Sequence, residues 1–493
     1  MGCICEFAVL IRGGGIRYNI GHMECLSSIG GSTLGVLGEE LGGAVAGIAR
    51  LVRDAGGRAL VVGGAVRDML SGAEKVKDVD VEVFGVEPER LKSILSERFE
   101  FDPCGISFGV LKIRHLDIDV SLPRRETKRG EGHKGFLVDS DPSMSVAEAA
   151  SRRDFTVNAI YWNPLDGRIE DPYGGVEDLR RRVLRHVSGK FSEDPLRVLR
   201  GMQFVARFDL MPAPETVEVC RAMGMEGLPP ERLFEEWAKL LLKGREIGKG
   251  LGFLRDTGWV AHFPELESLI GCRQDPEWHP EGDVWNHTCL CLDSFARERT
   301  GNRYEDLVVG LAVLCHDFGK PATTSYDPVK KRIRSLGHDE AGVAPTLSFL
   351  QRLTNEERIL KDVPPLVQCH MQPFSMWRSK VGDAAVRRLA VRVGRIDRLL
   401  RVARADDQGR PPGLCGGTSG GEDLRWLAEK AERLRVADAA PKPILMGRHL
   451  IGMGFKPSRQ FGQWLSACFD AQLDGAFSDL EGAVAYFHRN FGE

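Results

Sequence analysis

The sequence has no long apolar run and no closely spaced cysteine pairs of the kind that bind zinc. The longest uncharged apolar run in the middle of the chain, residues 307–315, has nine residues, whereas a membrane-spanning helix needs ~20. A membrane protein is therefore not expected. The 12 cysteines among 493 residues form no C-x-x-C pair. We expect reduced thiols and a cytoplasmic location, and neither a zinc knuckle nor a disulfide scaffold.

Neither sign of charge dominates, because 67 Lys and Arg stand against 70 Asp and Glu. This balance does not exclude nucleic acid, since binding depends on local patches. Hydrophobic residues make up 42% of the chain and charged residues 28%, which excludes a wholly disordered protein. The first 22 residues lack a basic start and a clean cleavage site, so a signal peptide is not expected.

The spacing of apolar residues predicts an α/β unit followed by a mostly helical remainder. Strands are expected at 59–62 and 79–84, two more around Arg114-His115 within 110–122, and helices at 41–55, 65–70 and 87–99. Residues 123–145 are charged and poorly periodic, which predicts a mobile loop. Helical patterns dominate from Leu179 onward, with boundary signals at 229–230, 271–283 and 409–421.

A glycine pair, Gly63-Gly64, follows the first predicted strand and precedes Arg67. Glycines let backbone N–H groups approach a phosphate at a helix start. A tight structural turn is an equally good interpretation of this pair taken alone.

Two carboxylates, Asp78 and Asp80, lie two apart on the second predicted strand. Strand side chains alternate, so both share one face while the valines between them face a core. A fold tolerates such neighbouring charges more readily when a divalent cation bridges them. Asp117 and Asp119 repeat the pattern, and a third carboxylate on a neighbouring strand would suit two Mg²⁺ ions. A solvated strand edge is the alternative.

Taken together, G-G-A-V-R-D from Gly63 and K-D-V-D from Lys77 resemble the polymerase-beta nucleotidyltransferase superfamily. More narrowly, the chain resembles the class II tRNA nucleotidyltransferases and bacterial poly(A) polymerases. Four further stretches match in order: R-R-D-F-T-V-N-A at 152–159, D-P-Y-G-G at 171–175, E-D-P-L-R-V-L-R at 193–200, and P-E-R with E-E within 230–236. The resemblance covers most of the chain from about residue 58.

This resemblance implies a metal site and a nucleotide site. Asp78, Asp80 and Asp119 would be the catalytic ligands of Mg²⁺, with Asp117 a weaker candidate for the third position. The implied nucleotide-binding residues are Gly63, Gly64 and Arg67 at the triphosphate, Arg153, Asp154 and Asn158 at the ribose, and Asp194, Arg197 and Arg200 at the base.

The residue types fit these roles. Adjacent arginines can neutralise phosphate, and Asp154 and Asn158, four apart, would share a helical face. Asp194 and Arg197, three apart, are expected to project from one helical face. A carboxylate and a guanidinium can then read the base edges of C and A and reject U and G. A charged helix start and a surface ion pair are the respective alternatives.

A second constellation combines histidines with aspartates. His287, the pair His316-Asp317 and Asp406 resemble the ligand set of an HD-type phosphohydrolase domain. The resemblance implies a divalent transition metal such as Mn²⁺ or Ni²⁺ and a substrate such as a 2′,3′-cyclic phosphate at an RNA end. His338 and His370 could extend the site or hold phosphate. A degenerate HD fold used as a scaffold is the alternative.

Basic residues recur at Arg388, Arg392, Arg395 and Arg398. Their spacing predicts a stripe on one helical face that attracts RNA phosphates without sequence preference, or else a solvated basic helix. The segment 128–136 matches the family's flexible loop.

We therefore expect an α/β polymerase-beta-like head followed by a mostly α-helical neck, HD domain and tail. The predicted segments are an extension of unknown role (1–55), the head (56–185), the neck (186–275), the HD domain (276–410), and a linker with tail (411–493). The expected function is addition of CMP and AMP from CTP and ATP to the 3′ end of tRNA, without membrane or obligate protein partners. Poly(A) addition, CC-only or A-only addition, HD hydrolysis alone and non-catalytic RNA binding remain alternatives.

Overall fold

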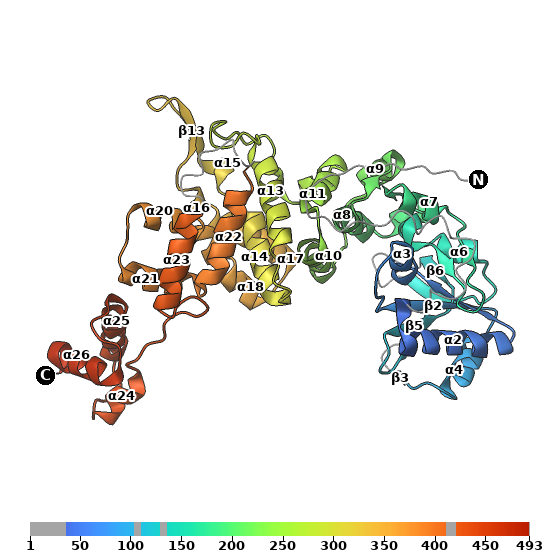
Figure 1. The fold of residues 1–493 in the computed structure, drawn as a ribbon, viewed down its shortest axis with the longest axis horizontal. Helices are drawn as coiled ribbons and strands as arrows, with labels where there is room; N and C mark the ends of the chain where they lie inside the picture. Colours follow the sequence, from blue (N-terminus) through green and yellow to red (C-terminus); the bar gives the residue numbers. More distant parts are fainter. Residues whose placement is uncertain (1–35, 103–109, 129–135, 411–420, 493) are drawn as a thin grey trace, which may run out of the picture. The chain divides into compact units, whose positions relative to one another are not determined.

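The computed structural model describes residues 36–102, 110–128, 136–410 and 421–492 (Figure 1). The chain forms two compact units, one of residues 1–194 with 211–216, the other of residues 195–210 with 217–493. Each unit is described by itself. Within the described ranges, every helix is too short or too polar to span a bilayer.

The first unit is built on a seven-stranded mixed sheet with the order β3-β4-β5-β2-β1-β8-β9. The parallel pair β2–β5 lies at its centre, and the other neighbours are antiparallel. The strands are β1 (Arg58–Val62), β2 (Val79–Phe84), β3 (Phe101–Asp102), β4 (Val110–Ile113), β5 (Ile118–Ser121), β8 (Tyr161–Trp162) and β9 (Ile169–Glu170). The strands and helices predicted between 41 and 122 are all present, with small shifts of their ends.

Apolar side chains on one face of this sheet form its main core. The alternating valines of β2 at 79, 81 and 83 are buried there, as the strand period requires. Helices α2 (Glu39–Asp54) and α4 (Pro88–Ser96) pack together over the same core (Figure 1). Part of the segment 1–55 is therefore structurally joined to the head.

The prediction of a loop at 123–145 is wrong. Strands β6 (Arg124–Lys128) and β7 (Phe136–Ser140) form an antiparallel pair, and α6 (Val146–Ala150) follows with a capping box at Ser145. β6 is mostly charged, β7 begins with three apolar residues, and neither shows a clear alternation, so each depends on its partner strand. The family's flexible loop at 128–136 lies almost wholly outside the described residues.

The second unit is almost entirely helical. It contains α8 (Leu196–Phe208), α10 (Pro230–Lys243), α11 (Ile247–Asp256), α12 (Pro264–Glu267), α13 (Val284–Arg297), α14 (Arg303–Cys315), α15 (Lys320–Thr323), α16 (His338–Ala341), α17 (Val343–Leu353), α18 (Glu357–Asp362), α19 (Pro364–Cys369), α20 (Gln372–Arg378), α21 (Asp383–Val393), α22 (Ile396–Gln408), α23 (Glu422–Arg433), α24 (Gly447–Gly452), α25 (Arg459–Asp474) and α26 (Leu480–Phe491). A hairpin of β12 (Thr324–Asp327) and β13 (Arg332–Ser335) interrupts them. Helix α9 (Pro214–Arg221) and the pair β10 (Val183–Leu184) and β11 (Met211–Pro212) occur where the chain passes between the units.

Three helices of this unit surround the second constellation. Helix α13 packs against α14 and α22. Asp283 caps the start of α13 by accepting from the Asn286 backbone N–H, and Asn302 caps α14 by accepting from Tyr304 and Glu305. Helix α14 is buried along its whole length from Asp306 onward, because it carries the longest apolar run noted above.

Candidate active sites

The glycine pair forms a tight turn between β1 and the short helix α3 (Gly64–Leu70). Gly63 has φ +82°, a conformation that favours glycine. A Cβ atom at this position would lie 3.2 Å from Asp80 Oδ2 and 3.3 Å from Arg153 Nη1. The turn therefore brings the backbone close to the predicted carboxylate and arginine.

The predicted carboxylates come together at the sheet. Asp80 of β2 and Asp119 of β5 are register partners on adjacent parallel strands, and Asp78 immediately precedes β2. Asp78, Asp80 and Asp119 line an open cleft of about 590 Å³, and Asp117 lines it too. An exposed set of neighbouring carboxylate oxygens is a donor set that suits Mg²⁺.

The electrostatics of this cleft agree with a cation site. Desolvation within the cleft, together with the carboxylates of Asp119 and Asp78, raises the pKa of Asp80, although Arg153 opposes the change. Lys112 on β4, which pairs with Asp119 in register, donates to Asp119 Oδ2 over 2.9 Å. Crowded negative charge is thus partly balanced by two basic side chains.

The R-R-D segment is placed as predicted, but its secondary structure differs. Asp154 and Asn158 do not share an α-helix, because 156–158 form a short 3₁₀ turn. The two side chains still meet, since Asn158 Nδ2 donates to Asp154 Oδ1 over 2.9 Å. Arg67 is only 4% exposed and donates to Asn158 Oδ1 over 2.6 Å. Arg67 therefore contacts Asn158 from the protein interior and holds its side chain in position.

Sequence reasoning gave no role to Glu82 or Tyr161. Tyr161 donates to Glu82 Oε2 over 2.7 Å, and Arg153 approaches the same carboxylate at 3.6 Å. The Arg153 guanidinium also lies over the Tyr161 ring, 5.6 Å from its centroid. Glu82 lies two residues after Asp80 on the same alternating strand, so it continues the carboxylate face of β2, and that was the available signal.

The D-P-Y-G-G motif at 171–175 packs against the 3₁₀ turn at 156–158. Asp171 accepts from the backbone N–H groups of Gly175 and Val176 at the start of α7 (Gly175–Arg180). A Cβ at Gly175 would lie 2.1 Å from the Thr156 carbonyl oxygen. Only glycine therefore allows α7 to approach the 3₁₀ turn this closely.

The predicted base-reading residues lie near a helix start. Asp194 has an extended backbone at the end of a 3₁₀ turn and precedes Pro195, whereas Arg197 and Arg200 belong to α8. The prediction that Asp194 and Arg197 share a helical face is wrong, because proline disfavours a helical conformation in the residue before it. Arg200 lies over the Phe204 ring at 5.5 Å.

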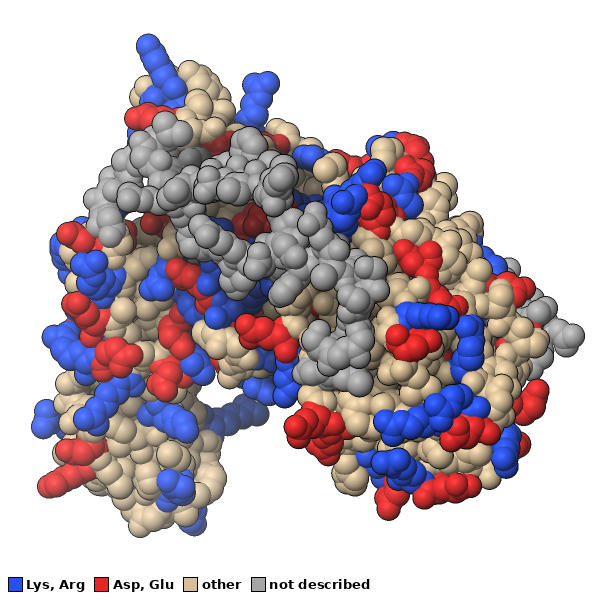
Figure 2. All heavy atoms as spheres, turned by 45° about the vertical axis from the view of Figure 1, so that its right-hand side comes forward, with Lys and Arg blue, Asp and Glu red and all other residues tan. Residues whose placement is uncertain are grey.

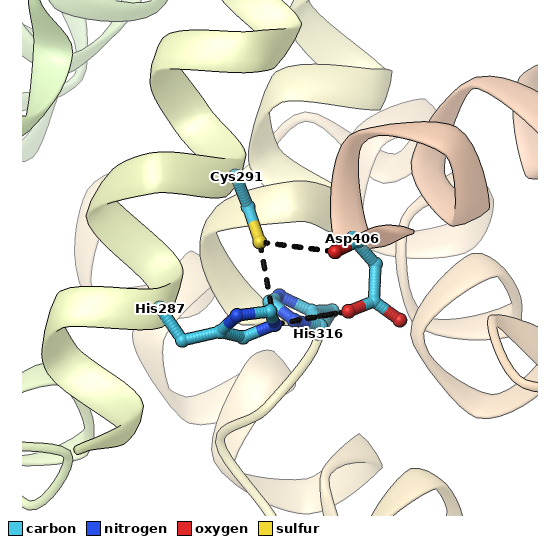
Figure 3. Close-up of side chains that lie close together, drawn as sticks. All are labelled: His287, Cys291, His316 and Asp406. Atoms are coloured by element: carbon cyan, nitrogen blue, oxygen red, sulfur yellow. Dashed lines mark hydrogen bonds and ion pairs between the residues drawn. The ribbon is translucent and has the colours of Figure 1, made fainter. Parts of the chain in front are cut away.

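The HD residues converge in one buried cluster. His287 comes from α13, His316 and Asp317 follow α14, and Asp406 comes from α22. His287 Nε2 lies 2.9 Å from Asp406 Oδ1, and His316 Nε2 lies 3.2 Å from Asp317 Oδ2 and 3.8 Å from Asp406 Oδ1. Figure 3 shows His287, His316 and Asp406 pointing toward one another.

Buried nitrogen and oxygen atoms of this cluster form a donor set for a cation. His287 Nδ1 donates to Glu281 and His316 Nδ1 donates to the Val313 carbonyl, both within 2.8 Å. The Nε2 atom of each ring then faces carboxylate oxygens, of Asp406 for His287 and of Asp317 for His316. Both oxygens of Asp317 and the Nε2 of His316 have no hydrogen-bond partner among the described residues. These residues fit a divalent metal bound through nitrogen and oxygen.

Neighbouring charges keep the carboxylates ionised. Burial opposes ionisation, yet His316 and Lys320 hold the pKa of Asp317 well below its usual range. Burial also opposes the ionised form of Glu281, but hydrogen bonds from His279 and His287 lower its pKa to about 2.

Lys320 and Glu281 were not identified from the sequence. Lys320 Nζ lies 2.7 Å from Asp317 Oδ2 and donates to Gln274 Oε1 over 2.7 Å. The sequence indicated Lys320 only by its position three residues after Asp317. Nothing in the sequence indicated Glu281.

His338 and His370 lie beside the four predicted ligands. Their Nε2 atoms are 3.2 Å apart, and His338 Nε2 is 3.5 Å from Asp317 Oδ1. Their Nδ1 atoms donate to backbone carbonyl oxygens of Ser335 and Val367. They form a second donor group with Asp317.

The predicted basic stripe does not exist as a single helical face. The helix breaks at Gly394, φ +74°, between α21 and α22. Arg398 is buried and pairs with Glu305 and Asp362, while Arg395 pairs with Asp397. On the face in view in Figure 2, Lys and Arg are interspersed with Asp and Glu.

The remaining two arginines, Arg388 and Arg392, lie on α21 and are exposed. Arg388 also pairs with Asp474 at 2.8 Å. These two side chains are the most exposed members of the predicted stripe, while Arg395 is partly exposed and Arg398 is buried.

Comparison with known proteins shows the family of the head and the fold of the chain. Residues 59–185 match the family model of the Poly A polymerase head domain. The chain is similar in fold to the Bacillus stearothermophilus CCA-adding enzyme in complex with CTP (TM-score 0.61, 21% identity, 92% of this chain and 98% of that one). It is also similar to the Thermotoga maritima CCA-adding enzyme complexed with tRNA (TM-score 0.55, 18% identity, 92% and 98%).

Curated relatives are more similar in sequence. The Multifunctional CCA protein of Xanthomonas campestris is 36% identical over 394 residues, which cover 77% of this chain and 92% of that protein. The protein of the same name from Xylella fastidiosa is 36% identical over 374 residues, covering 72% and 84%. At this identity and coverage, the chain belongs to the family of the multifunctional CCA proteins.

Proposed function

We propose that this chain adds CMP and AMP from CTP and ATP to the 3′ end of tRNA and releases pyrophosphate. The observation that carries the proposal is the register of β2 and β5, which sets Asp80 beside Asp119 in a cleft that Asp78 also lines. The names of the relatives, and the titles of similar structures with CTP, ATP and tRNA, support it.

Asp78, Asp80 and Asp119 would hold Mg²⁺ at the triphosphate. When bound, Mg²⁺ would neutralise charge on the phosphates and on the leaving pyrophosphate. The RNA 3′-oxygen forms a bond to the α-phosphorus as the bond to pyrophosphate breaks. Lys112 has to release Asp119 for this carboxylate to serve as a ligand, and its exposed side chain is free to swing into solvent.

Selection of the nucleotide would involve the segment next to the cleft. Arg153 would meet phosphate, held in place by Glu82 and Tyr161. Asp154 and Asn158 would contact the ribose, with Arg67 as their support. Asp194, Arg197 and Arg200 would read the base edge, a role that their donors and acceptors suit.

The HD cluster would hydrolyse phosphoesters such as a 2′,3′-cyclic phosphate. His287, His316, Asp317 and Asp406 would hold a divalent transition metal, which would supply an activated water. Lys320 keeps Asp317 ionised, and Glu281 fixes the tautomer of His287. His338 and His370 would extend the site. The description of the relatives as multifunctional supports a second activity.

The exposed arginines Arg388 and Arg392 would contact tRNA phosphates. Arg395 and Arg398 would stabilise the helical unit through their ion pairs with Asp397, Glu305 and Asp362. Since the described cysteines are free thiols, a reducing compartment such as the cytoplasm suits the protein.

A tRNA lacking its last three nucleotides tests the proposal, when it is incubated with CTP, with ATP, and with both. We expect two additions with CTP alone and three with both, followed by a stop. Long ATP-only tails would identify a poly(A) polymerase, and a single type of addition would identify a CC-only or A-only enzyme.

A further inference from the structure

A cysteine that is not part of the HD signature lies inside the HD cluster. Cys291 follows His287 by four residues on α13, so both side chains share one face of the helix. Cys291 Sγ lies 3.4 Å from His287 Nε2 and 3.9 Å from the Asp406 backbone oxygen. Figure 3 shows the sulfur directed toward the two histidines and Asp406.

The packing around this sulfur is tight. Cys291 is fully buried, and a Cβ added to Gly409 would lie 2.3 Å from its Sγ. Glycine at 409 therefore lets the end of α22 close over the thiol. The sulfur is confined next to the imidazoles.

A second observation shows that this pocket is set up for a cation. His316 is 1% exposed, and because its Nδ1 donates to the Val313 carbonyl, its Nε2 is directed into the cluster. That atom makes no hydrogen bond of good geometry among the residues described, although it lies 3.2 Å from Asp317 Oδ2 and 3.8 Å from Asp406 Oδ1. Buried polar atoms without partners are costly unless something binds them.

The donor atoms also have the spacing of a metal site. The ligand atoms of His287, Cys291, His316 and Asp406 all lie within 4.8 Å of one another. Bond lengths of ~2.3 Å to sulfur and ~2.0–2.1 Å to nitrogen in a tetrahedral site imply a sulfur–nitrogen separation of about 3.5 Å. The observed 3.4 Å between Cys291 Sγ and His287 Nε2 matches this value.

We propose that Cys291 is a further ligand of the HD metal, beside the residues proposed above and closest to the donor atoms of His287, His316 and Asp406, and that the site consequently takes a Zn²⁺-class ion. The inference rests on the proposed HD metal site and deepens it. A thiolate is a soft donor that favours Zn²⁺, whereas sites of imidazole and carboxylate alone accept Mn²⁺ or Ni²⁺ more readily.

The competing explanation is that Cys291 only fills space in the core. Burial raises the pKa of its thiol well above the ordinary value, so the thiol is neutral unless an ion binds it. A bound ion deprotonates a coordinating thiol outright. Spectra of the metal-loaded protein separate the two explanations.

The experiment loads the full chain with one equivalent of Co²⁺, which substitutes for Zn²⁺ and gives visible spectra. The wild type and Cys289→Ser should show d–d bands of bound Co²⁺ and an intense near-ultraviolet thiolate-to-cobalt band. Cys291→Ser should lose the near-ultraviolet band. Cys289 is a matched control, because it lies on the same helix, is partly exposed and belongs to no donor group among the described residues.

Co²⁺ bound without a thiolate band in the wild type, or a band that persists in Cys291→Ser, would overturn the inference and leave the HD metal site intact. If the HD cluster binds no Co²⁺, both the inference about Cys291 and the proposed HD metal site are overturned. X-ray absorption of the wild type with one equivalent of Zn²⁺ serves as a second measurement that does not depend on the folding of Cys291→Ser. A sulfur neighbour at ~2.3 Å supports the inference, and a shell of nitrogen and oxygen only at ~2.0–2.1 Å contradicts it.

Discussion

The substitution Asp80→Asn tests whether the Asp80 carboxylate serves the activity of the protein or its stability. Asp80 and Asp119 are register partners on adjacent strands, which lie about 4.8 Å apart. Two unit charges at about 5 Å repel by ~0.8 kcal/mol in water and ~3 kcal/mol at an effective dielectric constant of 20. Asp80 is exposed at the cleft and Arg153 offsets part of the repulsion, so the lower value applies.

We therefore expect Asp80→Asn to raise the free energy of unfolding in EDTA by about 1 kcal/mol, or a Tm increase of about 2–4 °C. The same change removes a metal ligand, and a loss of about 4 kcal/mol in transition-state stabilisation lowers kcat/KM about 10³-fold. The assays are thermal unfolding of the protein in EDTA and incorporation of CMP into truncated tRNA with Mg²⁺.

The matched control is Asp117→Asn, since Asp117 lines the same cleft but is not paired with Asp80 in the strand register. It should keep kcat/KM within about tenfold of the wild type. The reasoning is refuted if Asp80→Asn retains comparable activity, or if it destabilises the protein by more than about 2 kcal/mol, a loss typical of a structural role.

Three further predictions concern other parts of the chain. Asp78→Ala should abolish nucleotide addition and keep phosphoester hydrolysis, and His316→Ala should do the reverse; equal loss of both activities in either variant contradicts two separate sites. Gly175→Ala should lower the free energy of unfolding by about 1–3 kcal/mol, because its Cβ would overlap the Thr156 carbonyl oxygen; an unchanged denaturation midpoint is the contrary result. Burial raises the pKa of Asp293 to about 6, so its contribution to stability falls as the pH rises from about 4 to 6. Asp293→Asn, whose Oδ1 can still accept from Gly248, should raise Tm at pH 7 but not at pH 4, and a shift of equal size at both pH values would argue against this cause.

Much of the head could be predicted because each of its motifs consists of residues close together in the sequence. The alternating valines of β2 and the carboxylates between them define a strand with one buried face, and Asp78, Asp80 and Asp119 converge as expected. The HD residues converge for a similar reason, since His287 and Asp406 lie on helices with an apolar face and His316-Asp317 directly follow the apolar helix α14.

Other features depend on partners distant in the sequence. Within the described ranges, β6 and β7 pair only with each other, and neither the mostly charged β6 nor the short β7 alternates enough to mark a strand by itself. The expected stripe of arginines failed because Gly394 breaks the helix and Arg398 turns inward to Glu305 and Asp362. Cys291 had no motif to mark it, and only the fold places its sulfur among the histidines.

The most direct test of the central claim is the product ladder on tRNA that lacks its 3′ end, compared between the wild type and Asp80→Asn. The wild type should add two residues with CTP and a third when ATP is also present, and the variant should add none in the same time. Extension by the variant at the wild-type rate would contradict the assignment of the carboxylate cleft as the site of nucleotide addition.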